Sequence, residues 1–354
     1  MNTAVVVLNW NTKDYLRWFL PGLIASCKRL GASADGTPEA EVIVADSGSD
    51  DGSRDVLANE FPEVRTILLE KNYGFTGGYL KAFEALRDRN YDYYVLINSD
   101  VEVSGDWLEI LTKWMDSHPD CGICGPKLHG LLREGGELIR TGCFEYAGAG
   151  GGLMDRFGFP YCRGRIRKKV EEDHGQYDNC DPDVLWVTGA CLMIRSSLWW
   201  QLGGLDRRFF AHMEEIDLCW RAQLAGWKVQ VVPEALVWHL GGGTLQAASP
   251  FKLKLNWRNN LLLLENNLEY TYITKGFSAT KAGRKAARFI RFRVFLDNCA
   301  RIVYFCTGKP EYAKAVKQAH EEWRDLRMQG ARYPSPAKGS VIHGLTRRSI
   351  IFRY

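Results

Sequence analysis

Apolar residues in the first hundred positions occur in short runs that alternate with longer stretches of mixed polarity. The runs are rich in Val, Ile and Leu, which is typical of buried strands, and predict strands over residues 3–9, 42–46, 64–69 and 93–98. Between them, apolar residues recur every three or four positions and predict helices over residues 15–30, 54–59 and 79–89. This regular alternation predicts a layered α/β fold around a mostly parallel sheet.

Polar side chains stand where these strands end. Asn9 and Asp46 close the first two runs, Asn72 follows the third and Asp100 follows the fourth. Open α/β sheets bind their ligands at the carboxyl ends of the strands, so these four side chains are expected on one rim. Aspartate is also common in turns, and taken singly Asp46 and Asp100 are better explained as turn residues.

A second group of polar side chains occupies residues 209–239. Glu214, Glu215 and Asp217 begin a helix that is predicted by apolar spacing, and His239 ends the Val-rich strand after it. Carboxylates in a first helical turn are stabilised by the helix dipole, which by itself explains many such acids. Together with the acids on the rim, however, these residues predict an acid–base and metal site.

A nucleotide-activated sugar would use such groups. Charge grows on the diphosphate as the sugar leaves, so Mg²⁺ or Mn²⁺ held by carboxylate or imidazole would neutralise it. Asp100 and His239 offer these ligands. The acceptor hydroxyl loses its proton as it attacks, and either Glu214 or Glu215 could accept that proton. Asp217 would orient the acceptor or the base.

Charge is divided unequally along the chain. Residues 1–250 hold 25 Lys and Arg against 35 Asp and Glu, a net charge of −10, whereas residues 251–354 hold 21 against 7, a net charge of +14. We expect a catalytic domain over 1–250 and a basic helical region over 251–354. The Gly-rich and polar stretch 147–183 is expected to be a mobile loop or lid. The basic region either lies on an anionic membrane surface or packs on the acidic body.

Several function classes are disfavoured. The chain shows neither a secretory leader nor an apolar run of membrane-spanning length, and its ten scattered cysteines suit a reducing compartment. We therefore expect a cytoplasmic protein, at most peripheral on the inner face of the cell membrane. No nucleic acid is expected as a partner, because no nucleic-acid-binding motif is present. The sequence leaves open whether the chain forms a homo-oligomer. The first strand lacks a following G-x-G-x-x-G, which argues against a nucleotide-dependent oxidoreductase.

The motifs and their order resemble the family 2 glycosyltransferases over about residues 3–245, in the branch that includes rhamnosyltransferase-like and galactofuranosyltransferase-like proteins. The segments that carry the resemblance are residues 5–11, 44–53, 72–78, 97–100, 187–191, 214–217 and 238–239. The resemblance implies a GT-A fold, with a mixed, mostly parallel central sheet flanked by helices and a helical C-terminal extension.

The resemblance also implies roles for single residues. Those implied to bind the donor are Asn9, Asn11, Asp46, Asn72, Gly74, Phe75, Gly77, Asn98, Ser99 and Asp100. Asp100 and His239 would bind the divalent metal. The affinity for the metal would depend more on His239, because Asn98 replaces the first acid of the D-x-D motif. Glu215 stands at the position of the catalytic base, with Glu substituting for the usual Asp, so Glu214 remains an alternative.

The implied activity is inverting transfer of a sugar from a UDP- or dTDP-linked donor. The acceptor would be a hydroxyl of a glycan or polyprenyl-linked glycan in cell-surface polysaccharide synthesis. An alternative is a catalytically degenerate nucleotide-binding protein that is attached to the membrane through its basic tail.

Overall fold

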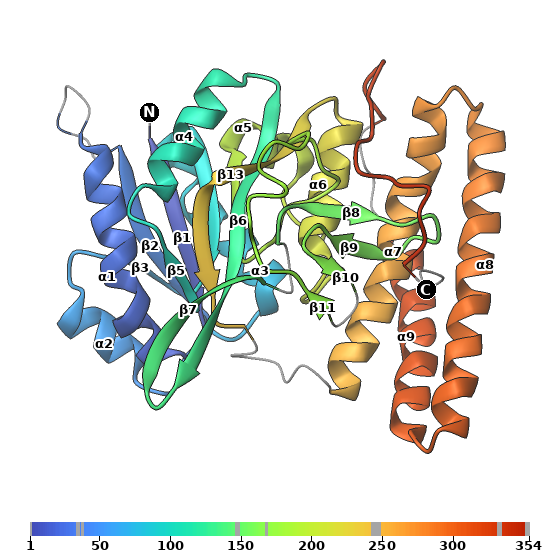
Figure 1. The fold of residues 1–354 in the computed structure, drawn as a ribbon, viewed down its shortest axis with the longest axis horizontal. Coiled ribbons are helices and arrows are strands. Elements are labelled where there is room, and N and C mark those ends of the chain that lie inside the picture. Colours follow the sequence, from blue (N-terminus) through green and yellow to red (C-terminus); the bar gives the residue numbers. More distant parts are fainter. Residues whose placement is uncertain are drawn as a thin grey trace.

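The computed structural model describes residues 2–32, 36, 39–145, 149–166, 169–241, 249–330 and 335–350. A nine-stranded sheet forms the centre of this part of the chain, helices cover both of its faces, and three long helices stand at one end (Figure 1). The strands of the sheet are β1 (Thr3–Asn9), β2 (Ala40–Asp46), β3 (Arg65–Leu68), β4 (Tyr93–Asn98), β5 (Val101–Val103), β6 (Cys121–Glu134), β7 (Glu137–Phe144), β12 (Cys191–Arg195) and β13 (Lys228–His239). The helices are α1 (Lys13–Leu30), α2 (Ser53–Glu60), α3 (Gly74–Ala85), the short 3₁₀ helix η1 (Arg87–Arg89), α4 (Trp107–Ser117), α5 (Ser196–Leu202), α6 (Glu214–Leu224), α7 (Pro250–Thr274), α8 (Ala279–Cys306) and α9 (Pro310–Met328).

The sheet is mixed and mostly parallel, which confirms the predicted fold class. Its strand order is β3-β2-β1-β4-β12-β6-β13-β5, and β7 pairs with the free part of β6. The first four strands are mutually parallel, as are β6 and β13, whereas β12, β5 and β7 run antiparallel to their neighbours. The carboxyl ends of β1, β2 and β4 therefore meet at one edge, as the sequence predicted.

Strands β1, β2 and β4 are buried on both faces of the sheet, which explains why they are apolar at most positions. In β1, Val5 and Val7 belong to one core cluster, under α1, α2 and α4. Ala4 and Val6 point to the opposite face and join a second cluster, under α3, α5 and α6. Successive side chains of a strand alternate between faces, so one apolar run supplies both cores.

Helix α7 belongs to the body of the molecule although it lies in the region predicted as a C-terminal extension. Its four consecutive leucines, residues 261–264, are fully buried and share the second core with Trp220 of α6. Helices α8 and α9 pack beside α7 and complete an antiparallel set of three (Figure 1). The acidic body and the basic region thus share one core, because α7 buries most of its surface between them.

The stretch 147–183, predicted as a mobile loop or lid, holds two small hairpins. These are β8 (Gly152–Met154) with β9 (Pro160–Cys162), and β10 (Arg165–Ile166) with β11 (Lys169–Val170), while residues 147, 148, 167 and 168 lie outside the described part. Met154 is buried and its N–H donates to the carbonyl of Gly344 at 2.9 Å. Much of the stretch is therefore packed, and its motion as a lid stays a prediction.

Candidate active site

Side chains join the carboxyl ends of β1, β2 and β4 into one polar rim. Asn9 and Asp46 are register partners, and Asn9 Nδ2 donates to Asp46 Oδ2 at 2.8 Å. Thr12 Oγ1 donates to Asn9 Oδ1 at 2.5 Å and lies 3.0 Å from Ser99 Oγ, at the end of β4. The structure therefore joins Asn9, Thr12, Asp46 and Ser99 by hydrogen bonds along this rim.

Asp46 lies beneath the surface of this rim. The residue is fully buried, and its Oδ1 accepts from Arg54 Nε at 2.8 Å and from the N–H of Ser49 at 3.1 Å. Burial acts to raise the pKa of Asp46, but the hydrogen bonds from Ser49, Arg54 and Asn9 hold it below its usual value. Asp46 thus stays ionised and shapes the loop after β2, and its contact with a nucleotide base stays a prediction.

A cavity of about 230 Å³ opens beside Asn11. It is lined by Asn11, Thr12, Lys13, Asp14, Tyr15, Trp18, Asp51 and Arg133. Asn11 takes a left-handed conformation (φ 55°) and exchanges two hydrogen bonds with Asp50, at 2.8 and 2.9 Å. The guanidinium of Arg133 lies 4.7 Å from the ring of Trp18. The lining holds two basic side chains, Lys13 and Arg133, beside two acidic ones, Asp14 and Asp51. The distant β6–β7 hairpin supplies Arg133, which no motif indicated.

The predicted donor loop, residues 72–78, turns out to be largely helical. Asn72 Oδ1 accepts from the N–H of Gly74 at 2.8 Å, so helix α3 begins at Gly74 rather than at the predicted Tyr79. Gly74 has φ +69°, and a Cβ there would lie 2.6 Å from the ring of Phe210. Only glycine fits this position, because both the backbone angle and the close approach exclude a side chain.

The donor loop, the strand region before β12 and helix α6 meet around Gly189. A Cβ on Gly189 would lie 3.2 Å from Phe75 Cζ and 3.5 Å from Glu215 Cβ. The next residue, Ala190, accepts from the N–H of Asn98 at 3.0 Å. The structure therefore brings the predicted donor residues Phe75 and Asn98 to the same corner as Glu215. Gly77 faces back onto its own loop, where a Cβ would lie 2.8 Å from Tyr73 Cβ.

Two adjacent carboxylic acids open helix α6. His212 and Met213, just before them, both take left-handed backbone conformations (φ 72° each), which non-glycine residues adopt at a cost in energy. Glu214 is 3% exposed, whereas Glu215 is only partly buried. Each has one buried carboxylate oxygen without a hydrogen-bond partner in the described part of the chain. Glu215 is therefore the more exposed of the two acids.

The surroundings of the two acids favour their neutral forms. Burial raises the pKa of Glu215 to about 7, and burial together with the neighbouring Glu215 raises the pKa of Glu214 well above its usual value. A general base works best when its pKa lies near the working pH. The pKa of about 7 and the greater exposure favour Glu215 over Glu214 as the candidate base. The residues alone left this choice open.

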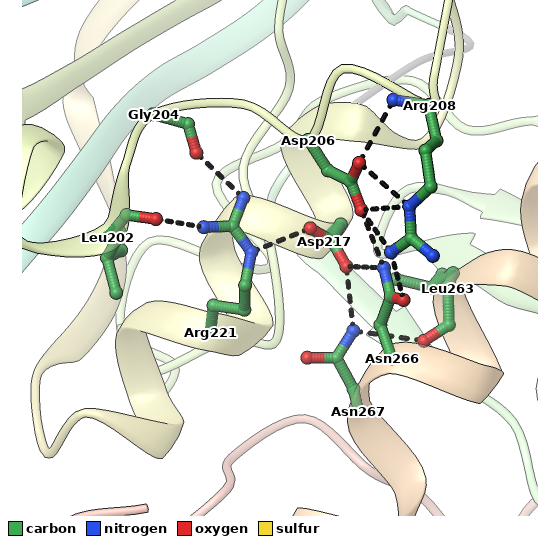
Figure 2. Close-up of polar contacts among 9 residues, drawn as sticks. All are labelled: Leu202, Gly204, Asp206, Arg208, Asp217, Arg221, Leu263, Asn266 and Asn267. Atoms are coloured by element: carbon green, nitrogen blue, oxygen red, sulfur yellow. Dashed lines mark hydrogen bonds and ion pairs between the residues drawn. The ribbon is translucent and has the colours of Figure 1, made fainter. Parts of the chain in front are cut away.

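Asp217 is predicted to orient the acceptor or the base, but its carboxylate lies against Arg221 and helix α7. It is fully buried, and its carboxylate accepts from Arg221 Nε at 2.7 Å and from the Nδ2 atoms of Asn266 and Asn267 at 2.9 Å each (Figure 2). Asp217 lies one helical turn from Arg221, so both side chains point to the same face of α6. That face packs on α7 rather than on the site.

Helix α7 also fixes the strained turn before α6. Asn259 Nδ2 donates to the carbonyls of Ala211 and His212 at 2.8 and 2.7 Å, and its Oδ1 accepts from Arg258 Nε at 2.8 Å. The asparagines of α7 are positioning residues that the sequence reasoning missed. A signal was present, because buried amides in a helix otherwise rich in leucine require polar partners.

Asp100 and His239 face each other at the rim, where β5 begins directly after Asp100 and pairs with the end of β13. His239 Nε2 lies 3.2 Å from Asp100 Oδ1, and the N–H of Leu240 donates to the carbonyl of Asp100 at 3.0 Å. Burial acts to lower the pKa of His239, but the charges of Asp100 and Glu145 raise it to about 10. A carboxylate oxygen and an imidazole nitrogen at this separation fit a divalent cation such as Mn²⁺.

Glu145, immediately after β7, is a further residue that the sequence reasoning missed. Its Oε1 lies 3.5 Å from His239 Nδ1, on the side of the ring opposite the Nε2 atom that meets Asp100. The residue belongs to none of the recognised motifs, and the β6–β7 hairpin brings it to the site from 94 positions away. No signal in the sequence pointed to it.

Solved structures with a similar fold are glycosyltransferases. GalNAc-T7, solved with UDP, GalNAc and Mn²⁺, aligns with a TM-score of 0.52 and 16% identity over 86% of this chain and 57% of its own. The mannosyltransferase PcManGT from Pyrobaculum calidifontis, solved with GDP-Man and Mn²⁺, aligns with a TM-score of 0.50 and 13% identity over 93% and 86%. These likenesses support the GT-A fold.

Sequence relatives are also glycosyltransferases. The chain is 26% identical over 250 residues to the N-acetylglucosaminyl-diphospho-decaprenol L-rhamnosyltransferase of Mycobacterium tuberculosis, covering 66% of this chain and 75% of that protein. It is 24% identical over 152 residues to the rhamnosyltransferase WbbL of Escherichia coli, covering 42% and 53%. The pattern of the glycosyltransferase-like family 2 matches residues 2–260. On this match, which spans the rim, helix α6 and His239, the chain belongs to the glycosyltransferase-like family 2.

Proposed function

We propose that the protein transfers a sugar, with inversion, from a UDP- or dTDP-linked donor to a hydroxyl of a polyprenyl-linked glycan. The observation that carries the proposal is the corner around Gly189. There Glu215, a carboxylic acid with a pKa of about 7, stands between the donor loop and the end of β4. The Mycobacterium tuberculosis relative acts on a diphospho-decaprenol acceptor by its name, which supports a lipid-linked acceptor here.

The proposed reaction is a single displacement. Glu215 takes the proton of the acceptor hydroxyl, whose oxygen forms a bond to the anomeric carbon of the sugar. The bond from that carbon to the diphosphate oxygen breaks, and the nucleoside diphosphate leaves with the electron pair. Lys13 and Arg133 lie where they would meet phosphate charge in the cavity beside Asn11. Holding both substrates in line is a main source of rate in such transfers.

A divalent metal, when bound, would neutralise the charge that develops on the diphosphate. Asp100 and His239 would hold it, through Oδ1 and Nε2. Glu145 would accept a hydrogen bond from His239 Nδ1, which fixes the ring and leaves Nε2 available for the metal. Carboxylates that orient metal-binding histidines in this way are common in metalloenzymes.

Removal of Asp100 tests the donor site. Calorimetric titration with UDP and with dTDP should give binding that is stronger with Mn²⁺ than without it, and the tighter nucleotide identifies the donor. Asp100→Ala should abolish the gain from Mn²⁺ while the weak metal-free binding remains, because the cavity beside Asn11 is unchanged. Binding that is the same with and without Mn²⁺ would remove Asp100 from a metal site. No binding of either nucleotide would contradict a UDP- or dTDP-linked donor.

Substitution of Glu145 should weaken the metal site without removing a ligand. Glu145→Ala is expected to lower Mn²⁺ affinity by about 10- to 100-fold, the usual effect of losing a residue that orients a metal-binding histidine. Glu145→Gln keeps an acceptor oxygen and should retain most of the affinity. The free Mn²⁺ signal in electron paramagnetic resonance measures both variants. Equal affinity in Glu145→Ala and the unchanged protein would contradict the orienting role.

A further inference from the structure

The outer helix α8 exposes large apolar side chains over its last four turns. They are Phe292, Phe295, Ile302, Val303 and Phe305, and they are between 43% and 70% exposed. Residues 295, 299, 302 and 306 follow the spacing of a single helical face, on which the exposed Cys299 and Cys306 fill the positions between the larger groups. The opposite side of α8 buries Ile290, Arg293 and Asp297 against the rest of the molecule. Contiguous exposed apolar patches of this kind usually mark a binding surface.

Basic side chains continue the same face toward the start of the helix. Arg284, Arg288 and Arg291 are all exposed, and their spacing places them in line with Phe295 and Ile302. The face therefore has a cationic half and an apolar half along one line. This distribution is typical of helices that bind anionic bilayers, where arginines meet headgroups while aromatic and aliphatic side chains enter the acyl boundary.

The apolar half of this face lies at the functional end of the molecule. Helix α8 ends at Cys306, and its turn into α9 lies at the same end of the molecule as the carboxyl ends of β1 and β4 (Figure 1). Tyr304 and Tyr312 stack across this turn with their ring centres 5.6 Å apart. Tyrosines are enriched at membrane interfaces, because the ring is apolar and the hydroxyl remains hydrated.

We propose that this face of α8, from Arg284 to Phe305, docks the protein on an anionic phospholipid bilayer. Docking would bring the protein to the membrane that holds a polyprenyl-linked acceptor, and to that extent the inference rests on the proposed function. Charge favours a bilayer over a second copy of the chain. Residues 251–354 carry a net charge of +14, so two copies that met through this face of α8 would bring like charges together, whereas anionic lipid neutralises them. In the described part of the chain no helix combines the length and apolarity that crossing a bilayer requires, so the attachment is to the surface.

Co-sedimentation of the full chain with vesicles tests the inference. The protein should sediment with vesicles of phosphatidylglycerol and phosphatidylcholine in equal parts and remain free with phosphatidylcholine alone. The combined variant Phe295→Ser, Ile302→Ser and Phe305→Ser should bind at least about tenfold more weakly, since each side chain loses its apolar burial. Replacing Arg284, Arg288 and Arg291 with Gln should weaken binding by about fivefold for each arginine, and added salt should reproduce much of this loss.

A matched control distinguishes the loss of this face of α8 from the general effect of removing an exposed apolar side chain. Met328→Ser removes an apolar side chain that is 83% exposed at the far end of α9, and it should leave vesicle binding unchanged. Equal losses in this control and in the triple serine variant would overturn the proposal. So would equal binding to both vesicle types, or a dimer in analytical ultracentrifugation that the serine variant dissociates.

Nucleotide titration of the same samples keeps the two proposals apart. A protein that binds UDP or dTDP with Mn²⁺ but no vesicles overturns the docking face alone. A protein that binds anionic vesicles but neither nucleotide overturns the proposed transfer and leaves the docking face intact.

Discussion

Glu215→Gln is expected to lower the rate of sugar transfer by about 10²- to 10⁴-fold, the usual loss when a general base is removed. Glutamine fills the same space and keeps a hydrogen-bonding group, but it cannot take a proton from the acceptor. Nucleotide binding should change little, because Glu215 lies at the corner with Gly189 and Phe75 rather than in the cavity beside Asn11. Steady-state transfer and calorimetric binding of the same sample separate the two effects.

Glu214→Gln is the matched control, because it changes the neighbouring acid in the same way. Glu214 is nearly fully buried, and its variant should retain most of the transfer rate. Loss of transfer in Glu214→Gln with an active Glu215→Gln would reverse the assignment of the base.

The pH profile gives an independent check on Glu215. Burial raises its pKa to about 7, so the carboxyl is protonated, and inactive as a base, below that pH. The value of kcat/KM should therefore rise with pH, level off above about 7, and fall tenfold for each pH unit below. A profile that is flat down to pH 5 would show that another group accepts the proton.

Asp217→Ala is expected to destabilise the fold by about 3–5 kcal/mol, the usual effect of leaving a buried charge without its partner. Arg221 is 3% exposed, and the carbonyls of Leu202 and Gly204, to which it also donates, are uncharged (Figure 2). Asn266 and Asn267 also lose their shared acceptor. The midpoint of urea unfolding measures the loss.

Removing both members of the pair tests whether the loss comes from the charge. Asp217→Ala combined with Arg221→Ala should be less destabilising than the sum of the two single changes, because no buried charge is then left unpaired. An acceptor-orienting role predicts a different pattern, in which Asp217→Ala keeps its stability and raises the KM for the acceptor. Unchanged unfolding with a raised KM would restore the role in acceptor binding that the structure argues against.

The amino-acid sequence determined the α/β class, the order of the first strands and the rim of polar residues that closes them. These features follow from local patterns, since apolar runs form strands and a parallel sheet gathers their carboxyl ends at one edge. The sequence also identified Asp100, His239 and the acids of α6 as candidates, because their motifs are short and contiguous. It placed the start of α3 too late, because the turn at Asn72 and Gly74 depends on the close approach of Phe210.

Only the tertiary structure distinguishes the three acids of α6 from one another. Glu214, Glu215 and Asp217 are alike in the sequence, but they differ in burial and in partners, because α6 presents one face to the rim and another to α7. The long β6–β7 hairpin places Glu145 and Arg133 at the site. The asparagines of α7 belong to the basic region that the charge distribution separated from the catalytic domain. Contacts between residues far apart along the chain depend on how the elements pack, and no local pattern of residues records that packing.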